Sequence, residues 1–422
     1  MDIPKFKDII QKLSFIRNYS SLVLPVIITV VAVLLFIPTQ LISSKLKKQI
    51  ENESISLGRD VQSLSESAVS RDQWEVEQEY QQKYDRDANQ TAILVRQSSQ
   101  RPLLSYKIFP TPKDPSTLIF EQFGQQFRRA ADKLIARINA LSCPTEAELQ
   151  KGLQGSSLPS SSLSPSSSSR PGLEEGSKKL SEVEATITDV LCREKAQSAF
   201  VYAVPTDLSG YEFWEEYKYT GIDAAVEDCW YWQLAYWVIE DVIDTIDSLN
   251  SGSNNVFTSP VKRLMGVNFA AGNKGGGGKT AARPSYVLPT KGALTEPHTR
   301  RFCNDDIDVV HFHVAVVVGT KAVLPFMQKL CSAKQHKFRG FSGEEQEQPF
   351  KHNQITILES NISPIDREDA THHLYRYGDD AVVELDLICE YIFDKKGYDD
   401  IKPELVKKSL TNPGEQAENV SY

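Results

Sequence analysis

The sequence predicts an α+β protein with a single N-terminal transmembrane helix, a helical stalk and one main folded domain. Three observations support this prediction: an uncharged apolar stretch near the N-terminus, a polar segment with heptad-like spacing after it, and helix and strand patterns in the order α-β-β-α-β-β further on. In that order, two helices can cover one face of a four-stranded antiparallel sheet. At 422 residues the chain is too long for one ordinary core.

Composition excludes several classes of protein. The net charge of −9 argues against a general nucleic-acid binder, which needs a basic face to neutralise phosphates. The six cysteines contain no C-x-x-C pair, so neither a zinc ribbon nor a thioredoxin-type motif is present. No cofactor is expected.

The membrane anchor is predicted over residues 22–42, after an N-terminal arm of residues 1–21. No charged side chain occurs between Arg17 and Lys45, and a helix of this length rises roughly 30 Å, the thickness of a bilayer's hydrocarbon core. A cleaved signal peptide is the alternative, but its apolar region is shorter and ends in a small-x-small site. Basic residues are equally frequent on both sides of the span, so they do not decide its orientation.

Residues 43–101 are predicted to form the helical stalk. Ile50, Leu57 and Leu64 are seven residues apart, which is heptad spacing. We interpret this seam either as a surface that pairs with a second membrane-anchored chain or as part of a solvated stalk.

Two segments separate the stalk from the main domain. The segment 102–154 begins with a proline-rich break and contains an amphipathic helix over residues 116–141. The serine-rich segment 155–177 is predicted to be a disordered linker, because its side chains cannot form a core.

The main domain is predicted over residues 178–393, with a glycine-rich insertion at 272–297 and a polar tail at 394–422, which is expected to be frayed after Tyr398. Its order is a circular permutation of the ferredoxin-like fold, in which the sheet is antiparallel. The helices are expected at 228–250 and 322–332, and the strands at 261–269, 308–318, 354–358 and 381–393.

This succession of segments resembles the PilO-type proteins of type IV pilus assembly and the GspM-type proteins of type II secretion. The second half carries the likeness best, in VVHFHVAVVVGTKAVLPFMQKL, HNQITIL and AVVELDLICEYIF. The chain departs from the pattern by its insertions and by about twice the expected length. The resemblance implies an inner-membrane protein with a periplasmic domain, which pairs with a similar single-span subunit as a homo- or heterodimer.

Motifs that suggest chemistry have weak contexts. Residues 273–280 read NKGGGGKT, but a phosphate-binding loop needs glycine at the first position and a following helix, and Pro284 and Pro289 oppose that helix. We therefore expect a flexible loop.

Histidines and acidic residues are also interpreted as structural. His311 and His313 share a strand face, but no third metal ligand can be assigned, even if His372 and His373 approach. Four acidic residues on one side of the 228–250 helix are expected to be solvated: Glu240, Asp241, Asp244 and Asp247. No catalytic, cofactor or metal residues are predicted.

Trp230, Leu234 and Trp237 form a second apolar stripe on that helix. One interpretation is intramolecular, with the 116–141 helix lying over them. The other is an exposed partner surface, since tryptophans are frequent interface anchors.

Together these observations predict a non-enzymatic, membrane-anchored scaffold of a pilus or secretion machine, with no nucleic-acid or small-molecule partner. The alternative is a membrane-anchored periplasmic sensor or ligand-binding domain, which would need a concave pocket.

Overall fold

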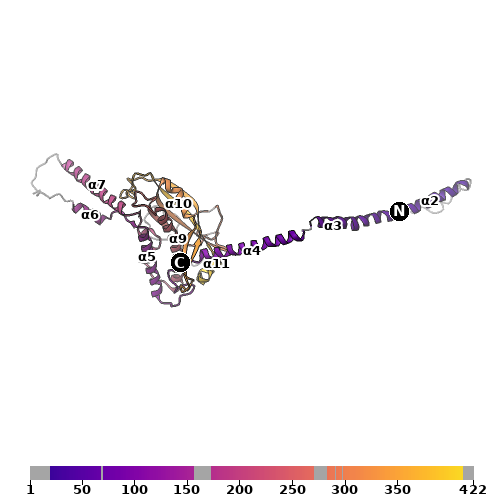
Figure 1. Ribbon diagram of the computed structural model, residues 1–422, viewed down its shortest axis with the longest axis horizontal. Coiled ribbons are helices and arrows are strands. Elements are labelled where there is room, and N and C mark those ends of the chain that lie inside the picture. The colour runs from indigo at the N-terminus through magenta and orange to yellow at the C-terminus, as the bar shows by residue number, and fades with distance from the viewer. Residues whose placement is uncertain are drawn as a thin grey trace, which may run out of the picture. The chain divides into compact units, whose positions relative to one another are not determined.

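The computed structural model describes residues 20–67, 70–155, 173–269, 283–289, 291–296 and 298–411. The chain divides into two units, Met1–Asp87 and Ala88–Tyr422, which are considered one at a time (Figure 1). Most of the predicted arm, the centre of the serine-rich linker, the NKGGGGKT segment and the last eleven residues of the predicted tail lie outside the described residues.

The first unit is helical in its described part. It contains α2 (Ser20–Ile50), the π-helical η2 (Glu51–Ile55), α3 (Ser56–Ser67) and the beginning of α4 (Arg71–Ser99). Among the described residues, one helical stretch, Leu24–Glu66, is long and apolar enough to cross a membrane, with a mean hydropathy of 2.4. The predicted apolar helix is therefore confirmed, although the helix extends well beyond residue 42.

The heptad seam has a defect that the spacing did not reveal. Ile50, Leu57 and Leu64 are all exposed on the helix surface, but η2 separates Ile50 from the other two. A π-helical turn contains more residues than an α-helical turn. Seven positions therefore do not return Leu57 to the face of Ile50, whereas Leu57 and Leu64 share a face of α3.

The second unit contains the end of α4 and all strands of the described chain. Its helices are α5 (Thr117–Arg137), α6 (Glu146–Gly155), α7 (Leu173–Ser198), η3 (Pro205–Asp207), α8 (Tyr211–Glu215), α9 (Ile222–Asn250), η4 (Thr320–Ala322), α10 (Val323–Leu330), α11 (Lys395–Tyr398), η5 (Asp399–Ile401) and α12 (Glu404–Thr411). Its strands are β1 (Ala140–Leu141), β2 (Val201–Tyr202), β3 (Val261–Asn268), β4 (Ile307–Gly319), β5 (Lys334–Phe338), β6 (Gln348–His352), β7 (Ile355–Pro364) and β8 (Val382–Asp394).

A mixed six-stranded sheet organises this unit, in the order β1-β2-β3-β4-β8-β7. The strands β3, β4, β8 and β7 pair antiparallel with their neighbours. The short strands β1 and β2 extend the sheet at β3 and pair in parallel. The expectation of four antiparallel strands was therefore incomplete. It also missed the separate β5–β6 hairpin, whose strands are five residues long and of which only β5 alternates between buried and exposed positions.

The core lies between one face of this sheet and the helices α9 and α10. Along β4, alternate residues such as Val310, Phe312 and Val314 are completely buried in this core. Phe326 and Leu330 of α10 belong to the same cluster, and α5 packs on α9 from the other side. Because α9 lies between a sheet and a helix, it is buried on most of its circumference, and a simple amphipathic pattern describes it poorly.

The expectation of a frayed tail after Tyr398 was wrong up to residue 411, since this part of the chain contains η5 and α12. Tyr398 and Lys402 are fully buried, and Val406 of α12 also belongs to the core. The glycine-rich insertion is likewise packed in its described second half, where Tyr286 and Val287 are buried. Both segments are packed because they contribute aromatic side chains to the core. Tyr286 and Tyr398 lie next to each other and contact Trp230.

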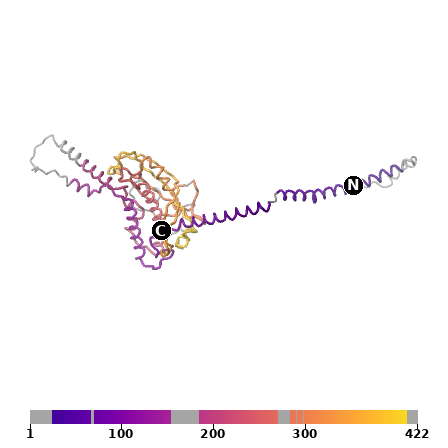
Figure 2. The backbone as a smooth tube through the Cα atoms, viewed as in Figure 1, coloured from indigo at the N-terminus to yellow at the C-terminus, as the bar shows by residue number. Residues whose placement is uncertain are grey.

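The end of α4 enters this core beside the C-terminal segment (Figure 2). Gly397 of α11 passes so close to α4 that a Cβ atom there would lie 2.4 Å from the backbone oxygen of Arg96. The neighbouring atom belongs to the backbone and cannot move aside cheaply. The glycine thus allows two segments that are about 300 positions apart in the sequence to pack closely against each other.

We predict that Gly397→Ala lowers the free energy of unfolding by about 1–3 kcal/mol, because overpacking displaces the backbone of α4 or α11. Urea unfolding of the full chain in detergent micelles, followed by tryptophan fluorescence, measures the change. Gly319→Ala is the matched control, since its Cβ would meet nothing nearer than 3.9 Å. Equal stability of Gly397→Ala and Gly319→Ala would contradict the predicted close approach.

Candidate functional site

The tryptophan stripe is part of the core, so its interpretation as an exposed partner surface is wrong. Trp230, Leu234 and Trp237 are fully buried. The indole nitrogen of Trp230 donates to the Tyr286 hydroxyl at 3.0 Å, and that of Trp237 donates to the Pro102 carbonyl at 2.8 Å. The stripe needs no second protein, because the chain covers its apolar and polar atoms.

The covering elements differ from the predicted one. Trp230 lies against Phe109 and stacks on Tyr398, with ring centroids 5.2 and 5.7 Å apart. Trp237 packs against Phe393 of β8. The helix α5 instead packs on a neighbouring stripe of α9, where Phe127 contacts Trp232.

The candidate histidines have partners within the chain. His311 is buried and its Nδ1 accepts the backbone N–H of Leu294 at 3.1 Å, while His313 lies 3.3 Å from Asp386. Burial lowers the pKa of His311 to about 4. His372 bonds to the Tyr377 hydroxyl. Within the described residues, no group of three or more His, Cys, Asp or Glu side chains could hold a metal ion.

The feature that distinguishes the second unit is a buried polar network centred on Arg101, two residues after the end of α4. The Arg101 side chain is 1% exposed, and so is that of Asp241 on α9. The two guanidinium nitrogens of Arg101 reach the two carboxylate oxygens of Asp241 at 3.3 and 3.1 Å. They also donate to the Tyr391 hydroxyl of β8 at 2.8 Å and to Glu240 at 2.8 Å. One arginine thus connects α4, α9 and the sheet.

Two histidines of the β5–β6 hairpin extend the network. His336 Nε2 lies 2.7 Å from the Gln100 carbonyl oxygen, so this nitrogen carries the proton and donates. Burial lowers the pKa of His336 to about 3, so its Nδ1 is the acceptor, and His352 Nδ1 donates to it at 2.9 Å. These partners assign the tautomers of both rings.

His352 Nε2 lies between a positively charged guanidinium group and a negatively charged carboxylate. It lies 3.0 Å from Arg101 Nη1 and 2.9 Å from Asp241 Oδ2. Burial is the largest cause that lowers the pKa of His352, and the positive charge of Arg101 lowers it further. In the neutral ring this nitrogen accepts from the guanidinium, whereas in the charged ring it would donate to the carboxylate.

The charges of the network stabilise one another. Burial alone would raise the pKa of the Asp241 carboxyl, but the charge of Arg101 holds it well below its usual range. Burial alone would lower the pKa of Arg101, and the charge of Asp241 keeps it well above its ordinary value. Both groups are therefore ionised at neutral pH. Removal of either one would leave the other charged and buried.

The expectation that the acidic side of α9 is solvated was wrong for Asp241. Asp244 and Asp247 are partly exposed and lie against Arg137 of α5, whereas Asp241 is completely enclosed. The missed partners, Arg101 and the two hairpin histidines, come from segments that are distant from Asp241 in the sequence. Arg101, a single arginine directly before Pro102, and one histidine on each strand of the hairpin gave no local signal for this network.

The backbone around Arg101 is fixed as well. Ser99 Oγ accepts the backbone N–H of Asp394 at 2.7 Å and the side-chain amide of Gln354 at 2.9 Å. The backbone N–H of Leu104 donates to the buried Gln233 at 2.7 Å. Residues 99–104 are therefore held on both sides of the arginine. We call this segment, with its partners Asp241, Tyr391, His336 and His352, the α4 anchor.

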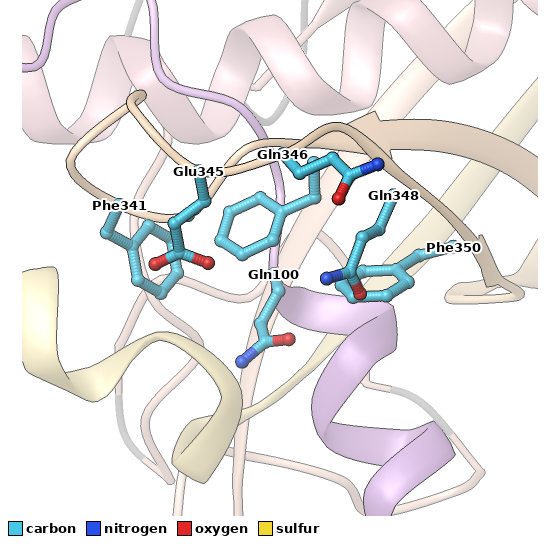
Figure 3. A pocket seen from close by; sticks show the side chains of 8 residues that line it. Gln100, Phe341, Glu345, Gln346, Gln348 and Phe350 are labelled. Atoms are coloured by element: carbon cyan, nitrogen blue, oxygen red, sulfur yellow. The ribbon is translucent and has the colours of Figure 1, made fainter.

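A pocket of about 280 Å³ adjoins the α4 anchor (Figure 3). Gln100 forms one side, and the hairpin β5–β6 with its connecting loop forms the rest. The lining residues are Gln100, Phe338, Gly340, Phe341, Glu345, Gln346, Gln348 and Phe350. The backbone carbonyl of Gln100 accepts from His336, so the pocket and the buried network share a residue.

Comparison with protein-family models, with curated proteins and with solved structures found no match for this chain.

We predict that Asp241→Asn lowers the free energy of unfolding by about 3–5 kcal/mol, because Arg101 stays buried without its counter-charge. Asp247→Asn is the matched control on the same helix. Its carboxylate is half exposed and 4.0 Å from Arg137, so we expect a change below about 1 kcal/mol. Urea unfolding of both full-length variants in detergent micelles measures the difference.

The same prediction has a pH dependence. Folding lowers the pKa of Asp241, so its stabilising contribution is complete above the unfolded pKa of about 3.9 and is lost as the pH falls further. The stability difference between the wild type and Asp241→Asn should therefore be constant near neutral pH. Below about pH 4 it should shrink by about 1.4 kcal/mol per pH unit. A difference that does not change down to pH 2 would contradict the assignment of a buried, ionised Asp241.

Proposed function

We propose that this protein is a membrane-anchored, non-enzymatic scaffold. The observation that carries the proposal is the α4 anchor, in which a helix of 29 residues ends in the core of the folded unit. A flexible linker would need no buried arginine and no hydrogen bonds on both sides of it. An attachment of this kind is useful where the position of a folded domain is to be set by the helix before it.

The sheet supports a ferredoxin-like interpretation of the main domain. The elements α9, β3, β4, α10, β7 and β8 follow one another in the predicted order, apart from the inserted hairpin. Their strands are arranged β3-β4-β8-β7 and are all antiparallel. This order is the one expected of a ferredoxin-like sheet whose first strand has moved to the end of the chain, and it supports that part of the proposal.

On this basis we retain the resemblance to PilO-type and GspM-type proteins as part of the proposal. The scaffold would act in a type IV pilus or type II secretion-like machine, with one span in the inner membrane and the folded domain in the periplasm. Support comes from the apolar helix, the polar helical segment after it and the strand order of the sheet.

The proposed partner is a similar single-span protein or a second copy of this chain. Leu57 and Leu64 lie on one face of α3 and are 58% and 67% exposed. Exposed leucines at heptad spacing are typical of a helix that pairs with another helix. Ile50 is not expected to continue this surface, because η2 changes the helical phase before Leu57.

A ligand-binding domain is the second candidate function, and one observation favours it. The pocket beside the α4 anchor is concave and lined by three phenylalanines and several polar side chains. Such a combination is usual in ligand sites. The two functions are compatible, since the pocket and the exposed leucines lie on different segments.

We predict that a photo-crosslinking amino acid at Leu57 or Leu64 captures a single-span membrane protein or a second copy of the chain in native membranes. Both side chains face the same direction on α3, where a paired helix would lie. Affinity purification from detergent-solubilised membranes and mass spectrometry identify the captured protein. Pilus or secretion components would support the proposed machine.

The control positions are Arg59 and Glu66. Each lies two residues after a probe position and therefore about 200° around the helix. Capture at the leucines but not at the controls supports pairing through this face. If all four positions capture the same proteins equally, or if none captures a membrane protein, the proposed pairing is wrong.

A further inference from the structure

We propose that the pocket beside the α4 anchor is a binding site for an organic ammonium cation, such as a quaternary ammonium group. This inference goes beyond scaffolding and does not depend on the identity of the pairing partner. It rests on the composition of the lining, on the arrangement of its aromatic rings and on the charge that the pocket leaves uncompensated.

The aromatic rings form walls at an angle to each other. The ring centroids of Phe338 and Phe341 are 4.9 Å apart with an interplanar angle of 74°, so these rings make a corner. Phe350 lies 5.7 Å from Phe338 at 31° and continues one wall. The face of an aromatic ring carries negative electrostatic potential, which attracts cations. These three phenylalanines pack against one another and together line one side of the pocket. Such an aromatic lining is suited to a cation that has an apolar surface.

Glu345 supplies the one formal charge of the lining (Figure 3). Its carboxylate comes close to Gly340, where an added Cβ would lie 2.3 Å from Glu345 Oε1. None of the ion pairs found among the described residues involves this carboxylate. The other polar groups of the lining are the amides of Gln100, Gln346 and Gln348. Their carbonyl oxygens can accept hydrogen bonds, but none of them carries a positive charge.

Three positively charged side chains near the pocket, Lys337, Arg339 and Arg101, pair with carboxylates other than Glu345. Lys337 of β5 is exposed, as is Arg339 directly after the end of β5, whereas His336 and Phe338 are buried. Both pair with Glu347, at 2.7 and 2.6 Å, and both bonds lower the pKa of that carboxyl. Arg101 is enclosed by Asp241 and Glu240. Glu345 is thus left to balance the charge of a ligand.

The size and surroundings of the pocket agree with a small ligand. A volume of about 280 Å³ is enough for a trimethylammonium group with a short polar chain. The Gly340 backbone, in the left-handed region at φ +73°, allows the loop to bring Glu345 next to the phenylalanines. A side chain at this position would both strain the turn and collide with the carboxylate.

The experiment is isothermal titration calorimetry of the full chain in dodecyl maltoside, a detergent without an ammonium head group. Choline chloride is the probe. Its neutral isostere 3,3-dimethylbutan-1-ol, in which carbon replaces the charged nitrogen, is the matched control. We expect saturable choline binding and, for the isostere, an affinity at least about tenfold weaker because it lacks the cation–π and carboxylate attraction.

Variants assign the site. Glu345→Gln keeps the shape of the side chain and should weaken choline binding about three- to tenfold, more strongly at low salt. Phe341→Leu removes one aromatic face and should weaken it about two- to fivefold. Glu344→Gln is the control, because its neighbouring carboxylate does not line the pocket. Circular dichroism verifies that each variant is folded.

Three results would overturn the proposal: no saturable choline binding, equal binding of choline and the neutral isostere, or equal effects of Glu345→Gln and Glu344→Gln. The first would mean that no ammonium site exists here. The second would mean that the pocket is merely apolar, and the third that choline binds elsewhere.

Discussion

The burial of one guanidinium group against one carboxylate is the constraint on which the second unit depends. Arg101 and Asp241 are both almost inaccessible to water and contact each other through two nitrogen–oxygen pairs. A buried ion pair adds little net stability compared with apolar side chains, but its geometry tolerates few alternatives. The pair therefore specifies where the end of α4 lies against α9. The Tyr391 hydroxyl accepts from Arg101 and donates to Asp241, and His352 contacts both groups. The Nε atom of Arg101 is buried without a hydrogen-bond partner among the described residues.

The other features of the fold are arranged around this contact. The segment 99–104 crosses the core next to Trp237, and the C-terminal α11 closes over it at Gly397. A second buried pair, Lys402 with Asp308, fixes the same C-terminal segment to β4, and Tyr398 donates to Asp308 at 2.6 Å. Buried charged side chains thus connect the sheet to the segment after α4, through Arg101, and to the segment after α11, through Lys402. In these surroundings an unpaired charge is costly.

Local patterns predicted the main elements because these elements depend on local periodicity. The β-branched run of β4, the alternation of β8 and the long helix α9 were all found near their actual positions. The network around Arg101 could not be found in this way, since Arg101 follows α4 and its partners lie on α9, β5, β6 and β8. The same limit explains the tail: its residues look polar in sequence, and only the three-dimensional contacts of Lys402 and Tyr398 bury them. For the tryptophans of α9, the helical pattern indicated a second apolar stripe but not which segment covers it.

Native-state hydrogen exchange of the backbone amides of residues 99–101 and 103–105, on both sides of Pro102, tests the central claim most directly. In the full chain, these amides should exchange with a free energy close to that of the amides in the centre of β4 and β8, because the α4 anchor opens only when the core unfolds. Exchange of residues 99–105 at the rate of the exposed α4 residues 71–87, while β4 and β8 stay protected, would contradict the account. The end of α4 would then be a linker, and its connection to the folded unit would not be rigid.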